Sequence, residues 1–238
     1  MQTQHTMRSF DDELNYLSDQ IAAMGGYAER MVAESVAALV QSDAALGRKV
    51  VEDDLFLDEK EREIGERAVI IIGKRQPVAD DLREIVGAIR ISSDLERIGD
   101  LGKNIAKRVV AVTEGSQPIR LFRGLEALAS LALTQLKEVL DVYASRSVER
   151  IGFVRDRDEE IDAMYTSLFR ELLTYMMEDP RNITACTHLL FCAKNIERIG
   201  DHATNIAETV HHIVTGRQLP LERPKEDQSH RVVAAPEY

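Results

Sequence analysis

The stretch Glu96-Arg97-Ile98-Gly99-Asp100 occurs a second time as Glu197-Arg198-Ile199-Gly200-Asp201, 101 residues further along the chain. Both copies run on, at the same interval, into Asn-Ile-Ala at residues 104–106 and 205–207. In a chain of 238 residues, a period of this length indicates that one unit of roughly a hundred residues has been duplicated. The sequence therefore predicts two similar units that each carry the same acidic string.

The composition favours helices over strands. Hydrophobic residues make up 44% of the chain, aromatic residues only 5%, and Trp is absent, so Ala, Val, Ile and Leu must build the core. Forty-one acidic against thirty basic residues leave a formal net charge of -11. This charge would repel nucleic-acid phosphates and the anionic face of a membrane. We therefore expect no nucleic acid among the partners.

Several features indicate a cytoplasmic protein. The longest strongly apolar run, residues 68–73, is far shorter than the roughly 20 residues of a membrane span. Residues 1–10 lack the apolar segment of a secretory signal. Cys186 and Cys192 are the only cysteines, and six helical residues place them about 240° apart, so they cannot pair. We expect two buried free thiols in a reducing compartment.

Stop signals divide the chain into six expected helices. Gly and Pro occur together at residues 73–77 and 115–118, and an Asp-Pro pair stands at residues 179–180. The expected helices cover residues 8–41, 44–72, 80–113, 122–145, 148–178 and 182–215. Three helices recur, which predicts an all-α fold of two tandem antiparallel three-helix bundles. The bundles should span residues 1–115 and 116–215, followed by a tail, 216–238, without a core of its own.

The last helix should carry its acids in one stripe. At about 100° per residue, an arc of roughly 80° holds Glu197, Asp201, Asn205 and Glu208. An apolar stripe lies roughly opposite and consists of Ile199, Ala203, Ile206, Val210 and Ile213. We therefore expect this helix to bury the apolar stripe and to turn its acids away from the core. In the first copy, Glu96, Asp100 and Asn104 stand in the same relation to Ile98, Ile105, Val109 and Val112.

The middle helix of each unit carries a further acidic pair, Asp54 with Asp58 and Asp158 with Asp162. Each pair lies roughly 90° to one side of an apolar stripe, where it can lean toward the neighbouring helix. The apolar stripes consist of Leu57, Ile64, Ala68 and Ile71 in the first unit and of Ile161, Leu168, Leu172 and Tyr175 in the second. Each bundle should then gather four carboxylates on one surface.

Converging carboxylates repel one another, and two features could offset that repulsion. Arg97 and Arg198 could form an exposed lattice with the acids, which is ordinary on protein surfaces. A bound cation is the alternative, because an all-oxygen ligand set suits Mg²⁺, Ca²⁺, Mn²⁺ or iron. Gly99 and Gly200 leave a similar choice between close helix contact and access for an ion or another chain.

Other chemistry finds little support. Glu208 and His211 form a single Glu-x-x-His pair, whereas a ferritin-like di-iron site needs two. His202, His211 and His212 are expected on a solvated surface. The sequence contains no Gly-rich phosphate loop, no Cys-x-x-Cys pair and no recognisable nucleophile with a His partner. We therefore expect no enzymatic activity.

Taken together, the tandem three-helix units with these acidic motifs resemble the PhoU family of phosphate-uptake regulators over residues 8–215. The resemblance implies that the acidic motifs bind metal clusters of more than one ion, with iron, manganese, magnesium or zinc as the candidates. The implied metal ligands are Asp54, Asp58, Glu96, Asp100, Asp158, Asp162, Glu197 and Asp201.

The same resemblance implies a negative regulator of phosphate-starvation signalling and phosphate uptake. Such a regulator would be an adaptor between the ATPase PstB of the phosphate ABC transporter and the histidine kinase PhoR. It would form a homodimer or a higher homo-oligomer and would meet the membrane only through its partners. Two alternatives stay open: a carboxylate-bridged metal enzyme or metal store, and a metal-free helical scaffold whose acids meet basic partner surfaces.

The two copies also differ in charge. Lys107 stands at the position that corresponds to Glu208, and Asp94 at the position that corresponds to Asn195. Because a lysine opposes cation binding, we hypothesise that the second cluster binds metal more tightly than the first.

Overall fold

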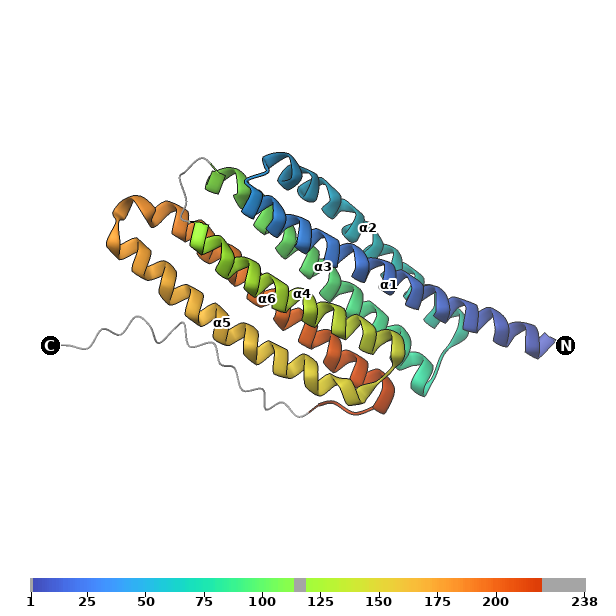
Figure 1. Ribbon diagram of the computed structural model, residues 1–238. Helices are drawn as coiled ribbons and strands as arrows, with labels where there is room; N and C mark the ends of the chain where they lie inside the picture. Colours follow the sequence, from blue (N-terminus) through green and yellow to red (C-terminus); the bar gives the residue numbers. More distant parts are fainter. Residues whose placement is uncertain (1, 114–118, 220–238) are drawn as a thin grey trace.

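The structure, a computed structural model, describes residues 2–113 and 119–219. Within these ranges the chain forms six α-helices and two short 3-10 turns and contains no strand (Figure 1). The helices are α1 (Gln2–Gln41), α2 (Ala44–Arg75), α3 (Ala79–Thr113), α4 (Ile119–Ser145), α5 (Ile151–Glu178) and α6 (Ile183–Thr215). The 3-10 turns η1 (Val148–Arg150) and η2 (Pro180–Asn182) precede α5 and α6. The predicted all-α fold is confirmed.

The helices form two three-helix bundles that lie side by side (Figure 1). α1, α2 and α3 pack together in one bundle, and α4, α5 and α6 in the other. α3 lies along α6, and α1 also contacts α4. Buried residues from all six helices form one continuous apolar cluster. The bundles were predicted, but the sequence did not show that they share a core.

The ends of α2 follow from local chemistry. The side chain of Asp43 accepts hydrogen bonds from the backbone N–H groups of Ala45 and Leu46 and so caps the first turn. At the other end Gln76 adopts a left-handed conformation with φ of 50°, and its N–H donates to the carbonyl of Ile72. Pro77 follows and disfavours further helix. The helix therefore passes through Gly73 and ends at Arg75, beyond the predicted end at residue 72.

The other predicted boundaries need small corrections. α1 begins at Gln2 rather than at residue 8, because residues 2–8 contain no Gly or Pro to stop a helix. Residues 148–150 and 180–182 form 3-10 turns before α5 and α6, and the backbone N–H of Arg181 donates to the Asp179 side chain. Residues 114–118 and 220–238, which hold most of the predicted junction and tail, lie outside the described residues. Leu219, at the start of that tail, packs against the core.

The predicted apolar stripes are buried. All five stripe residues of α6, all four of α2, and Ile98, Ile105 and Val109 of α3 lie in the core, while the side chain of Val112 lies outside the described residues. On α5, Ile161, Leu168 and Leu172 are buried and Tyr175 is partly buried. A Cβ atom on Gly87 of α3 would collide with Ile213 of α6. Glycine at this position therefore lets the two bundles approach closely.

Cys186 and Cys192 are free and buried, as predicted. Burial raises the pKa of the Cys192 thiol to about 12.

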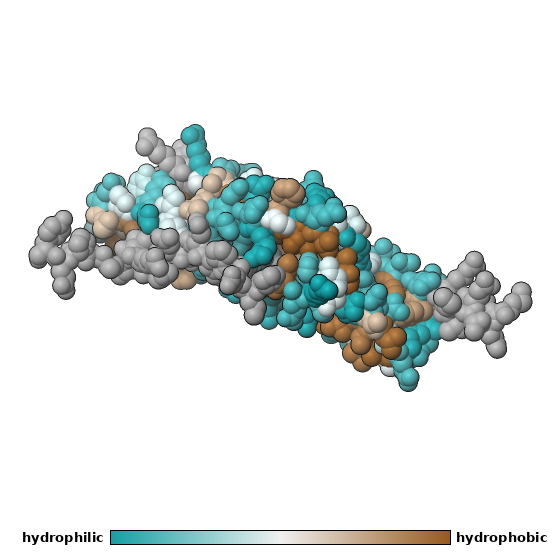
Figure 2. All heavy atoms as spheres, turned by 90° about the horizontal axis from the view of Figure 1, so that it is seen from below, coloured by the Kyte–Doolittle hydropathy of each residue, from teal (hydrophilic) through white to brown (hydrophobic). Residues whose placement is uncertain are grey.

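In the described part of the chain, no helix is both long enough and apolar enough to cross a membrane. On the face shown in Figure 2, hydrophilic residues cover much of the surface, and several apolar areas interrupt them.

Candidate functional site

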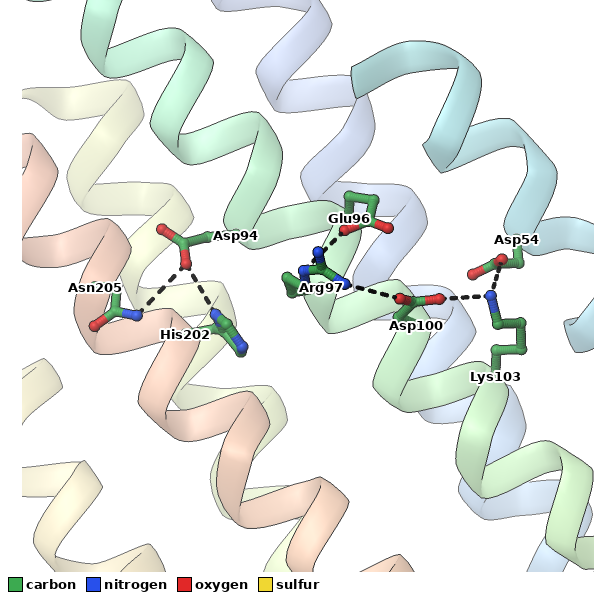
Figure 3. A network of polar contacts seen from close by, with 8 residues as sticks. All are labelled: Asp54, Asp94, Glu96, Arg97, Asp100, Lys103, His202 and Asn205. Atoms are coloured by element: carbon green, nitrogen blue, oxygen red, sulfur yellow. Dashed lines mark hydrogen bonds and ion pairs between the residues drawn. The ribbon is translucent and has the colours of Figure 1, made fainter. Parts of the chain in front are cut away.

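The first acidic cluster joins α2 to α3 through a lysine (Figure 3). Asp54 of α2 is buried, and Asp100 of α3 is half-buried. The ammonium group of Lys103, one turn after Asp100, donates a hydrogen bond to each of these carboxylates. Burial lowers the pKa of Lys103, but the hydrogen bonds to Asp100 and Asp54 outweigh it and raise that pKa above its ordinary value. A charged lysine therefore stands between the two acids.

Glu96 lies at the other side of the same cluster (Figure 3). Arg97 bridges Glu96 and Asp100, with nitrogen to oxygen distances of 3.5 and 3.4 Å. Burial raises the pKa of Glu96, and repulsion from Asp100 and, more weakly, from Asp58 adds to the effect. Asp58 itself is exposed on α2. The first cluster is thus a chain of alternating charges in which Asp58 takes part only through its electrostatic field.

The second cluster joins α5 to α6 and lies deeper. Asp158 and Asp162 of α5 are buried, and Glu197 of α6 is only 3% exposed. The prediction that α6 turns its acids away from the core is therefore wrong for Glu197. The physical reason is that α6 packs against α3, α4 and α5, so its buried arc is wider than a single apolar stripe.

Glu197 has one satisfied and one unsatisfied oxygen. Its Oε1 accepts a hydrogen bond from Lys194 Nζ at 2.8 Å, whereas its buried Oε2 has no hydrogen-bond partner among the described residues. Burial raises the pKa of Glu197, the Lys194 hydrogen bond opposes this, and repulsion from Asp201 and Asp162 adds to the rise. Glu197, Asp162 and Asp201 are thus electrostatic neighbours, as the helical spacing predicted.

Gln135 of α4 completes the surroundings of Asp158. Its amide nitrogen lies 3.4 Å from Asp158 Oδ1 and donates at 3.0 Å to the carbonyl of Val154 and to Thr204 Oγ1. A Cβ atom on Gly200 would lie 3.0 Å from Gln135 Oε1 and 3.4 Å from Asp158 Oδ1. Glycine at position 200 therefore lets the backbone of α6 approach these two polar groups closely.

The surroundings of Gly99 are apolar. A Cβ atom there would collide with the buried side chain of Leu57. The two glycines thus both mark close helix contacts, with an apolar side chain in the first copy and with two polar groups and Ile161 in the second.

The eight predicted ligands are chemically suited to bind metal ions, although in neither cluster are they arranged around a common ion position. Among the described residues, no three His, Cys, Asp or Glu side chains are placed to hold one ion. Carboxylate oxygens are nevertheless the donors that hard cations prefer. In the second cluster, the buried Oε2 of Glu197, which has no hydrogen-bond partner among the described residues, is an unused donor atom. In the first cluster the ammonium group of Lys103 already pairs with Asp54 and Asp100.

Two sequence-based expectations about basic residues are wrong. Lys107 does not face the first acidic cluster, because it lines a separate depression between α3 and α6. The lysine that does distinguish the clusters is Lys103, which corresponds to Thr204 in the second copy. His202 is half-buried rather than solvated. Its Nδ1 lies 2.8 Å from Asp94 Oδ1, which joins α6 to α3 (Figure 3).

Comparison with known proteins identifies the family. A family model described as "PhoU domain" matches the chain twice, at residues 21–109 and 125–210. These two matches cover the two bundles and most of the chain. The chain belongs to the PhoU family. The two PhoU domains contain all eight predicted acids, four in each.

Named relatives and solved structures agree with this assignment. A phosphate-specific transport system accessory protein PhoU homolog from Rhizobium meliloti (strain 1021) is 68% identical over 94% of this chain and 95% of its own length. A homolog with the same description from Caulobacter vibrioides is 49% identical over 94% of the chain and 98% of its own. The crystal structure of PhoU from Pseudomonas aeruginosa is 37% identical, with a TM-score of 0.84 over 87% of this chain and all of that one.

Proposed function

We propose that this protein is a regulatory accessory protein of a phosphate-specific transport system. It acts in the cytoplasm as an adaptor between the transport ATPase PstB and the histidine kinase PhoR, and it represses phosphate-starvation signalling when phosphate is plentiful. The observation that carries the proposal is the pair of PhoU domains, together with 68% identity to a PhoU homolog over 94% of the chain. The protein works by binding and does not turn over a substrate.

The two acidic clusters are the proposed metal sites of this adaptor. Asp54, Asp58, Glu96 and Asp100 would hold ions in the first, and Asp158, Asp162, Glu197 and Asp201 in the second. A bound cation, whether iron, manganese, magnesium or zinc, would supply positive charge that offsets the repulsion among the acids. The four carboxylates of each cluster come from two helices, so an ion there would also tie those helices together.

The second cluster should bind cations more tightly than the first. Lys103 is 19% exposed and pairs with both Asp54 and Asp100, so a metal must displace it. Lys194 is 42% exposed, and Oε2 of its partner Glu197 has no hydrogen-bond partner among the described residues. A titration with Mn²⁺ that compares Asp201→Ala with Asp100→Ala tests this order. We expect the larger loss of affinity from Asp201→Ala, and a larger loss from Asp100→Ala would contradict the order.

The proposed assembly is a homodimer or higher homo-oligomer that reaches the membrane only through its partners. A complementation experiment tests the regulatory role as a whole. In a bacterium that lacks its own PhoU protein, the chain should restore repression of a phosphate-starvation reporter at high phosphate. A folded variant with Glu96→Gln, Asp100→Asn, Glu197→Gln and Asp201→Asn should restore it less. Full expression of the chain without any repression would overturn the regulatory role.

A further inference from the structure

A depression between α3 and α6 collects positive charge on an acidic protein. It has a volume of about 420 Å³ and is lined by Asn104, Lys107, Arg108, His188 and Asn195. None of these side chains is acidic, although the chain has a formal net charge of -11. One water molecule occupies about 30 Å³, so the depression has room for a small anion and several waters. Its lining offers cations and amide donors to such a ligand.

Contacts on two sides hold Arg108 in place. Its Nη1 lies 3.2 Å from Nδ1 of His188, and its guanidinium group lies 4.1 Å from the centre of the Phe191 ring. Because a guanidinium group only donates, His188 accepts with Nδ1 and carries its proton on Nε2. Within the described residues, neither Arg108 nor Lys107 is within ion-pair distance of a carboxylate. The two cations therefore keep their charge available to a ligand.

The internal repeat shows what distinguishes this depression from its counterpart. Arg108 and His188 correspond, at the interval of 101 residues, to Thr209 and Gly87 at the other end of the same helix pair, where a Cβ atom on Gly87 would lie 3.6 Å from Thr209 Cγ2. Similarly, Asn104 and Asn195 correspond to Asn205 and Asp94. α3 and α6 thus meet in two related ends of one quasi-symmetric contact.

At one end a carboxylate fills the space between the helices. Asp94 Oδ1 accepts hydrogen bonds there from His202 and, at 3.5 Å, from Asn205 (Figure 3). At the other end Asn195 takes the place of Asp94, so none of the described residues that line the depression places a carboxylate opposite the amide of Asn104. The end that contains Asp94 therefore carries its own anion. The end that contains Asn195, which we call the second end, presents amide donors and cations, and none of its described lining residues is acidic.

We propose that this second end binds a phosphate-type oxyanion, either free or as a phosphomonoester. Lys107 and Arg108 supply the charge-assisted hydrogen bonds that recognise phosphate oxygens, and the amides of Asn104 and Asn195 add neutral donors. The inference rests on the lining of the depression and stands independently of the proposed regulatory function and of any metal.

Nuclear magnetic resonance of the full-length chain tests the proposal. Inorganic phosphate is titrated at constant ionic strength, with chloride as the balancing ion, and the His188 ring and the side-chain amides of Asn104 and Asn195 are followed. We expect these signals to shift together and to saturate. Constant ionic strength matters because surface charges are screened by salt. A parallel titration with glycerol 3-phosphate shows, by its relative affinity, whether the site prefers the free or the esterified ion.

Matched variants locate the binding. Asn195→Asp places a carboxylate where the other end has Asp94, and it should weaken phosphate binding at least tenfold. Its control is the reciprocal Asp94→Asn, which should leave the affinity unchanged. Lys107→Gln, an exposed substitution that the fold tolerates, should weaken binding several-fold. Shifts that do not saturate, or an affinity that is the same in Asn195→Asp, Lys107→Gln and the wild type, would overturn the proposal.

Discussion

At the scale of single residues, the two acidic clusters differ in how their charge is balanced. Lys103 pairs with two carboxylates at once, whereas in the second cluster the buried Oε2 of Glu197 has no hydrogen-bond partner among the described residues. Helical spacing predicted that Asp100 lies beside Glu96 and Asp201 beside Glu197, because residues i and i+4 share one face of a helix. Spacing could not identify Lys103 or Gln135 as their partners, because partners on other helices depend on how each helix is rotated.

Replacement of Lys103 by Met should expose the cost of the buried acid that it serves. Asp54 would remain buried without a cation beside it. Removal of one member of a buried ion pair lowers the free energy of unfolding by about 3 kcal/mol. The loss should be measured by urea unfolding at pH 7, with Lys49→Met as the control. Because Lys49 and its partner Glu34 are 55% and 25% exposed, that control should lose about 1 kcal/mol or less. Equal losses in the two variants would contradict the claim that Lys103 compensates a buried acid.

The Glu197 carboxyl group should make the protein less stable as the pH rises. Its pKa in the folded chain is raised above the ordinary value of 4.5, first by burial and then by repulsion from Asp201 and Asp162. The folded chain therefore holds this proton more tightly, and the associated stability is lost as the pH rises through the window between 4.5 and the raised pKa.

We therefore expect Glu197→Gln, in buffer with EDTA, to raise Tm at pH 7 by a few degrees. In a chain of this length about 1 kcal/mol corresponds to roughly 2–4 °C. At pH 4 the difference from the wild type should largely disappear. Glu208→Gln, on the same helix and half-buried, serves as the control and should change little. A Tm that falls by the same amount at both pH values would show that the charged Glu197 carboxylate does not destabilise the folded chain.

At the scale of helices, sequence signals located the start and the buried face of α2 but not its end. The predicted start at residue 44 and the apolar stripe are confirmed, whereas Gly73 lies inside the helix, which ends before the left-handed Gln76. The burial of Glu197 was missed because a single apolar stripe accounts for packing against only one neighbouring helix. α6 packs against three helices, α3, α4 and α5, so a larger part of its surface is buried.

Two glycines in neighbouring helices should respond oppositely to the same substitution. Gly65 of α2 has nothing within 4 Å of its would-be Cβ atom, so Gly65→Ala should stabilise the helix by up to about 1 kcal/mol. Gly99→Ala would push against Leu57, which is fully buried, and should cost about 1–3 kcal/mol. Chemical unfolding of both variants measures the difference. Stabilisation by Gly99→Ala would mean that α2 and α3 are less closely packed than described.

At the scale of the whole molecule, the two PhoU domains share one core. The repeat predicted two bundles correctly, but repetition alone does not show whether the copies are separate or packed together. α3 and α6 meet through small and polar residues such as Gly87 and Asp94, which carry no hydrophobic signal in the sequence. The depression with Lys107 and Arg108 was missed for the same reason.

A shared core predicts one cooperative unfolding transition. Calorimetry of the full chain should give a single peak whose calorimetric and van't Hoff enthalpies agree. Leu57→Ala in the first bundle and Leu172→Ala in the second should each lower that one Tm, because each removes a buried side chain worth about 2–5 kcal/mol. Two separate peaks, each shifted by only one of the variants, would show that the bundles unfold independently.

Direct binding to the proposed partners tests the central claim most directly. The purified chain is presented to PstB and to the cytoplasmic part of PhoR, beside the variant with Glu96→Gln, Asp100→Asn, Glu197→Gln and Asp201→Asn, whose folding is checked by circular dichroism. We predict that the wild type binds both partners and that the folded variant binds them more weakly. Absence of binding by the wild type, with both partners folded, would contradict the adaptor function.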